Sequence, residues 1–192
     1  MSVSRLLPLL LAPLGLFACS SGESNKDPVA EAKFKNEKRI GDEAITEKQE
    51  QDAEYVVNTA SRNMFVRDAS QLAQTKSASA AVKTLAQTLV AQHAIAQQAL
   101  QTLAAQKNIA LPTGLGGSQA KALGQLAALN GAAFDQKYTD MLIEAHKKAV
   151  DETDDMRDDA YDGDIRQLAT QQLPLLKQHL EAAEALEDQL NK

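Results

Sequence analysis

Apolar or small residues recur every three or four positions along four long stretches of this chain, which is the spacing that places them on one face of an α-helix. The four stretches cover residues 52–76, 79–108, 132–161 and 164–190. No stretch alternates between apolar and polar residues as a half-buried β-strand does. The sequence therefore predicts an all-α protein.

The connections between these stretches indicate how the helices pack. The first and third connections are short, whereas Pro112, Gly114 and Gly116 lengthen the second. A short amphipathic helix is expected within this longer connection, at residues 118–129. Four helices of similar length with mostly short loops favour an up-down-up-down arrangement. We therefore expect a four-helix bundle over residues 51–192, with an extra short helix in the second connection.

The beginning of the chain has the features of a bacterial export signal. Arg5 supplies a positive charge, and residues 6–17 form an apolar segment that is too short to span a membrane. The segment ends in residues 16–19 (LFAC), which resemble the lipobox of bacterial lipoproteins. The resemblance implies that residues 1–18 are removed as a signal peptide and that Cys19 carries a lipid.

A lipid on Cys19 would be the protein's contact with a membrane. In lipoproteins of double-membrane bacteria, an Asp directly after the Cys favours retention at the inner membrane, and here that position holds Ser20. By analogy, we expect a cell-envelope protein at the outer membrane that faces the periplasm.

Residues 19–50 have a different composition from the rest of the chain. They are polar, rich in charges of both signs and poor in large apolar side chains. A segment of this composition has no apolar face to bury, even if it is helical. We therefore expect residues 19–50 to form a flexible tether between the membrane and the bundle.

The charge and the cysteine count exclude two classes of function. The formal net charge is −6, and no stripe of Lys and Arg is present to neutralise phosphates, so we expect no nucleic-acid partner. The chain has a single Cys, which excludes an intramolecular disulfide and a Cys-based metal cluster. Neither observation identifies a protein partner or an oligomeric state.

The three histidines of the chain are the strongest candidates for a functional site. His93, His146 and His179 each lie on the apolar face of a different long helix, at positions where the pattern calls for Leu or Ala. Each also lies near the middle of its helix, so packing the helices side by side should bring the three imidazoles to one level. Met64 of the first long helix should lie near the same level.

Such a layer has two interpretations. Helical bundles build metal sites from inward-facing side chains, and imidazole is a common ligand of copper and zinc. Three imidazoles with the thioether of Met64 would favour copper, and three imidazoles with water would suit zinc. Alternatively, the imidazoles form a polar layer with one another, with water or with neighbours such as Gln92, Tyr138 and Thr153, and only set the helix register.

A di-iron enzyme is disfavoured by the positions of the carboxylates. Such enzymes need inward-facing acids and Glu-x-x-His pairs on two helices. Glu144 lies two residues before His146, so the two side chains do not share a helix face. Val90 and Leu176 occupy the positions three residues before the other two histidines. We therefore expect no catalytic activity.

Four segments carry a resemblance to a known family. They are residues 88–93 (TLVAQH), 131–138 (GAAFDQKY), 141–146 (MLIEAH) and 173–180 (LPLLKQHL). In these segments the chain resembles the bacterial secreted and membrane-anchored family called domain of unknown function 4142, and the likeness covers residues 52–187. The resemblance implies a ferritin-like helical bundle in the cell envelope and supplies no established activity.

The chain departs from this family's pattern at two positions. Members often carry an Asp directly before the histidine of the second long helix, where this chain has Gln92. They also often carry a Glu in the first long helix, around the place where this chain has Val66. If that acid took part in a site, the site of this chain would be altered.

Two hypotheses follow from the sequence. In the first, the protein binds copper or zinc through His93, His146 and His179, with Met64 as a possible fourth ligand, and serves in envelope metal handling or stress tolerance. In the second, it is a non-catalytic structural or interaction module whose histidine layer is only a polar network in the core.

Overall fold

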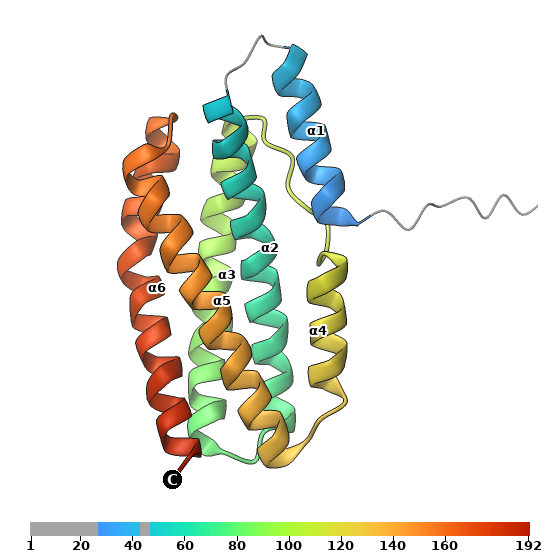
Figure 1. The fold of residues 1–192 in the computed structure, drawn as a ribbon, viewed down its shortest axis with the longest axis vertical. Helices are drawn as coiled ribbons and strands as arrows, with labels where there is room; N and C mark the ends of the chain where they lie inside the picture. The colour runs from blue at the N-terminus through green and yellow to red at the C-terminus, as the bar shows by residue number, and fades with distance from the viewer. Residues whose placement is uncertain (1–26, 43–46) are drawn as a thin grey trace, which may run out of the picture.

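Six helices make up the secondary structure of residues 27–42 and 47–192, which are the residues that the computed structural model describes. The helices are α1 (Pro28–Asp42), α2 (Glu47–Lys76), α3 (Ala80–Gln106), α4 (Gly117–Ala127), α5 (Gly131–Asp159) and α6 (Gly163–Leu190) (Figure 1). No strand occurs in these two ranges, so the predicted all-α fold is confirmed. The expected signal peptide and Cys19 lie outside the described residues.

Local signals in the sequence determine where several helices begin. The Ser79 hydroxyl accepts a hydrogen bond from the Val82 N–H at 3.4 Å and caps α3. The Asp162 carboxylate accepts the Asp164 N–H at 2.8 Å and caps α6. Gly131 opens α5 at a φ of +59°, which glycine adopts without steric cost. None of the helices in the described part of the chain is both long and apolar enough to cross a membrane.

The ends of the long helices show in which direction each one runs. The Asp52 carboxylate, near the start of α2, accepts the backbone N–H groups of Tyr161 and Asp162 between α5 and α6. The Lys107 ammonium, directly after α3, lies 2.6 Å from an Asp162 oxygen. At the opposite end of the bundle, the Lys76 ammonium at the end of α2 lies 3.3 Å from the Leu129 carbonyl, just before α5. Helices α3 and α5 therefore run in the same direction (Figure 1).

The expected up-down-up-down order is thus wrong. The second connection does not lead directly into an antiparallel helix. Its loop and α4 run along the bundle to the end where α3 began (Figure 1). The fifth helix therefore starts from that end and runs parallel to α3. One long crossover of this kind is a feature of ferritin-like bundles.

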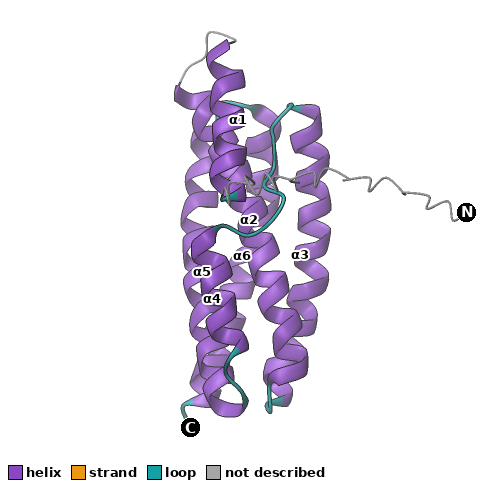
Figure 2. Ribbon diagram, turned by 90° about the vertical axis from the view of Figure 1, so that its right-hand side faces the viewer, coloured by secondary structure: helices purple, strands orange, loops and turns teal. Residues whose placement is uncertain are grey.

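The segment expected to be a flexible tether contains a packed helix. Helix α1 lies along the outside of α2, end to end with α4 (Figures 1 and 2). Its residues Ala32, Asn36 and Ile40 recur every four positions and are only 3%, 3% and 1% exposed. The expectation that residues 19–50 bury no face is therefore wrong for α1. The sequence signal is weak because one of the three buried residues is polar and another is small.

Polar contacts attach α1 to the rest of the bundle. The Asn36 amide donates to the Ala110 carbonyl at 2.9 Å and accepts the Ala110 N–H at 2.6 Å. Asp27 caps α1 and also accepts the Gly117 N–H at the start of α4. These hydrogen bonds join α1 to the crossover connection, so both α1 and α4 are positioned by the same loop.

We expect Asn36→Ala to lower the free energy of unfolding by about 1–3 kcal/mol, because it leaves the partly buried N–H and carbonyl of Ala110 without these partners. Urea unfolding followed by circular dichroism measures this loss. The matched control is Phe34→Ala on the same helix, since that side chain is 64% exposed and its removal should change little. Equal effects of the two substitutions would mean that α1 does not pack as described.

The core of the bundle is divided into two apolar clusters by a polar layer. The lower cluster in Figure 1 includes Leu89, Phe134, Tyr138 and Leu142, and the upper cluster includes Leu100 and other residues near the α5–α6 turn. His93 lies between Leu89 and Leu100 on α3, so the histidine layer separates the clusters. Val66 is fully buried in the lower cluster.

Candidate metal centre

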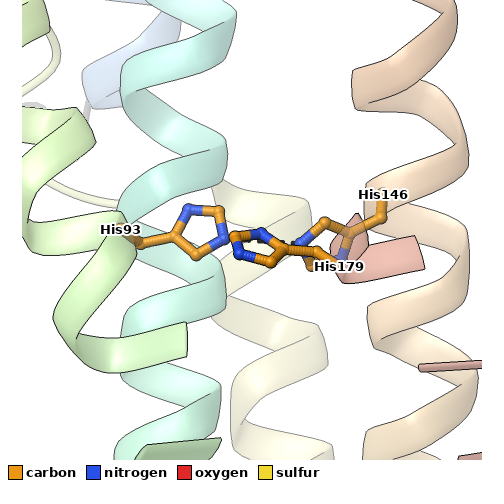
Figure 3. Close-up of side chains that lie close together, drawn as sticks. All are labelled: His93, His146 and His179. Atoms are coloured by element: carbon orange, nitrogen blue, oxygen red, sulfur yellow. Dashed lines mark hydrogen bonds between the residues drawn. The ribbon is translucent and has the colours of Figure 1, made fainter. Parts of the chain in front are cut away.

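The three histidines meet in the middle of the bundle, as the sequence predicts. His93 projects from α3, His146 from α5 and His179 from α6, and the three side chains point toward one another (Figure 3). They are 3%, 1% and 5% exposed. Three imidazoles from separate helices therefore share one buried layer.

The distances between the rings are nearly equal. Ring centroids are 5.5 Å apart for His93 and His146, 5.2 Å for His93 and His179, and 5.3 Å for His146 and His179. One nitrogen from each ring lies within 4.8 Å of the other two. Because each ligand atom sits about 2 Å from a shared ion, this spacing can hold a metal ion.

The tautomer of His146 is determined by its backbone neighbour. The Nδ1 atom lies 2.8 Å from the Leu142 carbonyl oxygen, which can only accept a hydrogen bond. Nδ1 therefore carries the proton, and in the neutral ring Nε2 carries a lone pair. This lone pair faces the other two histidines (Figure 3).

His93 is oriented in the same way by a side chain of α2. Its Nδ1 lies 2.9 Å from the Asn63 amide oxygen, so Nδ1 donates and Nε2 again carries a lone pair. With Nδ1 protonated in both neutral rings, the two Nε2 atoms, which lie 3.4 Å apart, have no proton to share. Two facing lone pairs repel each other, whereas an ion bound to both would remove the repulsion. Two nitrogens at tetrahedral positions on one zinc or copper ion would be about 3.3 Å apart.

His179 completes the set through its other nitrogen. Its Nε2 donates to the Gln92 amide oxygen, which leaves the lone pair on Nδ1. Nδ1 is buried and makes no hydrogen bond with the described residues. All three imidazoles are thus held by an oxygen acceptor on one nitrogen, which is the usual arrangement of metal-binding histidines.

Burial lowers the pKa of all three histidines, because desolvation favours the neutral ring. The pKa of His146 and the pKa of His179 both fall to about 4. The pKa of His93 falls well below its ordinary value through burial and through repulsion by His146, His179 and Arg62. At neutral pH the three rings are therefore uncharged, which is the state that binds metal ions.

We expect the metal-free protein to lose stability between pH 7 and pH 5. Histidines in the unfolded chain titrate near pH 6.5, whereas His146 and His179 titrate near 4 when folded. Between these values the unfolded chain binds more protons, so the free energy of unfolding falls as the pH falls. At pH 5 the loss should be about 1–2 kcal/mol for each of the two residues, as measured by urea unfolding.

The control for this measurement is the triple variant His93→Gln, His146→Gln, His179→Gln, which has no imidazole left to protonate. Its stability should change much less over the same pH range. If the triple variant and the parent show the same pH dependence, the acid sensitivity comes from carboxylates and not from the histidine layer.

A partly buried ion pair lies beside the layer. The Arg62 guanidinium, next to Asn63 on α2, pairs with the Glu152 carboxylate of α5, and their side chains are 10% and 27% exposed. The positive charge of Arg62 contributes to lowering the pKa of both His93 and His146. A charge that acts on both imidazoles would also act on an ion bound between them.

Met64, the expected fourth ligand, lies next to Asn63 on α2. The α2 side chain that contacts the histidines is that of Asn63, and successive residues of a helix point about 100° apart. Met64 is only half-buried. Its role as a ligand therefore stays a prediction without support from a contact.

Of the polar neighbours considered from the sequence, only Gln92 contacts a histidine through a hydrogen bond in the described structure. Tyr138 bonds to Ser70 and Thr153 bonds to Tyr55. The acceptors on Asn63 and Leu142 could not have been identified from the sequence, because no motif marks an amide or a carbonyl that orients a ring.

Comparison with known proteins agrees with this helical fold. The family described as "domain of unknown function (DUF4142)" matches residues 39–186. A solved structure described as "CopM in the Cu(II)-bound form" superposes with a TM-score of 0.61 at 14% sequence identity, covering 72% of this chain and 96% of that chain. At this identity the likeness concerns the helical fold. Comparison with curated proteins gives no match.

Proposed function

This chain belongs to the DUF4142 family, and we propose that it is a cell-envelope protein that binds one copper or zinc ion through His93, His146 and His179. The proposal includes a non-catalytic role in envelope metal handling. We also propose that a lipid on Cys19 anchors the protein to the membrane, with the helical domain facing the periplasm.

One observation carries the metal proposal. Oxygen acceptors on Asn63, Leu142 and Gln92 hold one nitrogen of each imidazole, so the three remaining lone pairs point into the same space. A polar layer that only sets helix register would gain more from rings that donate to one another. Here the closest ring contact, Nε2 to Nε2 at 3.4 Å, lacks a donor in the neutral state.

The chemistry of the donors limits the kind of ion. Imidazole nitrogen suits copper and zinc, whereas magnesium and calcium prefer oxygen ligands. The structural neighbour is a copper-bound protein by its description, which supports copper as the first ion to test.

A structural or interaction module is the alternative. Such a module should present a contiguous apolar surface to its partner. The large apolar side chains that are exposed among the described residues are Phe34, Ile95 and Tyr161. They lie on three different elements, α1, α3 and the α5–α6 turn. This distribution favours the metal-site proposal over a docking surface.

The decisive experiment is elemental analysis of the full chain, expressed with its own leader and purified without a histidine tag. After loading with copper or zinc and desalting, the parent should retain close to one ion per chain and the triple His→Gln variant should retain none. Met64→Leu should retain the ion if the thioether is not a ligand. A parent that keeps no ion after loading, or a variant that keeps as much, would refute the proposal.

The location is tested on the same preparation. Intact mass spectrometry should find a chain that begins at Cys19 and carries acyl groups, recovered with the outer-membrane fraction. The substitution Cys19→Ala should abolish the lipid. A soluble mature chain without added mass would contradict the anchor while leaving the metal proposal unaffected.

A further inference from the structure

We propose that the three-histidine site selects a soft monovalent cation, Cu(I), over the divalent ions Zn(II) and Cu(II). This inference rests on the proposed function and adds the charge state of the ion.

The donor set is electrically neutral. Within residues 27–42 and 47–192, the group of potential ligands that lies within 4.8 Å contains only the three imidazoles. No carboxylate and no thiol of the described chain joins it. An ion in this site would therefore keep its whole charge, because none of its ligands carries a compensating negative charge.

Burial makes that charge costly. The three histidines are at most 5% exposed, and apolar clusters lie on both sides of their layer. The free energy of moving an ion from water into such an environment grows with the square of its charge. A divalent ion thus meets about four times the desolvation penalty of a monovalent ion of similar size.

The positive charge of Arg62 also disfavours a divalent ion in the site. The guanidinium lies close enough to act on both His93 and His146, and its side chain is 10% exposed. Its partner Glu152 also lies 3.8 Å from the Lys148 ammonium, so one carboxylate is shared by two cations. The positive charge of Arg62, which acts on both rings, repels a divalent ion twice as strongly as a monovalent one.

The arrangement of the rings also suits Cu(I). The three centroid distances differ by little, between 5.2 and 5.5 Å, so the three rings surround one point at the corners of a nearly equilateral triangle. Cu(I) accepts trigonal coordination by three nitrogens. Structural zinc sites are almost always tetrahedral, and no Cys, Asp, Glu or further His of the described residues joins the three imidazoles here, so Zn(II) would need a fourth ligand such as water.

The test compares affinities in the full chain. Cu(I) is titrated anaerobically against a chromophoric Cu(I) chelator with ascorbate present, and Zn(II) is titrated against a fluorescent zinc chelator. The triple His→Gln variant corrects for ions bound elsewhere. We expect Cu(I) to bind roughly 100-fold more tightly than Zn(II) in the parent.

Two variants separate the effect of Arg62 from the effect of the donors. Arg62→Met should raise the affinity for Zn(II) roughly 10-fold and that for Cu(I) only roughly 3-fold, since the divalent ion responds with twice the free energy. Arg62→Lys keeps the charge and should preserve the parent's preference. The matched control is Lys148→Met, which removes the other cation next to Glu152 but from a side chain that is 72% exposed. Its effect on either ion should be less than about 2-fold.

Two outcomes would overturn the inference alone. One is Zn(II) binding through the histidines at least as tightly as Cu(I) in the parent, a comparison that requires no variant to fold. The other is an Arg62→Met chain that folds and changes both affinities by the same factor. If neither ion binds in a histidine-dependent manner, the proposed function itself fails, so the two failures can be told apart.

Discussion

A saturating concentration of copper or zinc is expected to raise the thermal unfolding temperature of the full chain by about 8–16 °C. The same addition should leave the unfolding temperature of the triple variant His93→Gln, His146→Gln, His179→Gln unchanged. Differential scanning calorimetry of both proteins, with and without the ion, measures this difference.

The size of the effect follows from mass action. An ion that binds the folded chain only, at a free concentration about 1,000 times its dissociation constant, adds about 4 kcal/mol to the free energy of unfolding. The unfolded chain offers no equivalent site, because 53 and 33 residues separate the three histidines along the sequence. The folded chain already holds the rings in place through Asn63, Leu142 and Gln92, so binding requires little rearrangement.

The metal-free proteins supply the control for this experiment. If the triple variant unfolds cooperatively by itself, the absence of a metal-induced shift reports lost binding and not a lost fold. A shift of equal size in the variant would place the ion elsewhere, for example on exposed carboxylates near the end of α5 such as those of Asp155 and Asp159. That result would remove the main support for the proposed metal centre.

Tyr138→Ala is expected to lower the free energy of unfolding by about 3–5 kcal/mol. Tyr138 is fully buried in the lower cluster, where its ring stacks on Phe134 at a centroid distance of 6.1 Å. Truncation removes these contacts and leaves a cavity between α2 and α5. It also leaves the buried Ser70 hydroxyl without its partner, which now lies at 2.8 Å.

Two further substitutions divide this effect into its parts. Tyr138→Phe keeps the ring and removes only the hydroxyl, so it should cost about 1–2 kcal/mol. Tyr161→Ala is the matched control, because that ring is 57% exposed, and its loss should stay within about 0.5 kcal/mol. Urea unfolding of the three variants measures all three values. Equal losses from Tyr138→Ala and Tyr161→Ala would contradict the described packing of the core.

Much of the fold could be predicted from the sequence because helix formation is largely local. The periodic apolar residues of α3, α5 and α6 and the capping side chain of Ser79 lie within a few residues of the helices that they determine. The convergence of His93, His146 and His179 was also predictable. A residue at the middle of a helix lies at the middle of the bundle whichever way that helix runs.

The direction of α5 was not predictable, because it depends on a connection and not on a helix face. Residues 107–130 could start the next helix at the end of the bundle where α3 stops, or run along the bundle and start it at the other end. The periodicity of the helices does not distinguish these two paths. In the folded chain, Asp27 and Asn36 of the α1 segment bind Gly117 and Ala110 of this connection. Hydrogen bonds between segments about 70–90 positions apart leave no pattern that a single sequence displays.

The same reason explains why α1 was expected to be a tether. Its buried face consists of Ala32, Asn36 and Ile40, and the polar residue among them is acceptable only because Ala110 satisfies both its donor and its acceptor. Composition therefore underestimates burial wherever a buried polar group has a distant partner.

The sequence by itself determined that the protein is helical and that three imidazoles from three helices meet in its core, because both depend on residue spacing along single helices. Only the tertiary structure decided which ring nitrogens carry lone pairs and which charge lies beside them. Those properties depend on the Asn63 and Gln92 amides, the Leu142 carbonyl and the Arg62 guanidinium. Hydrogen bonds and charges of this kind act through space over a few ångströms, so they exist only once the helices are packed.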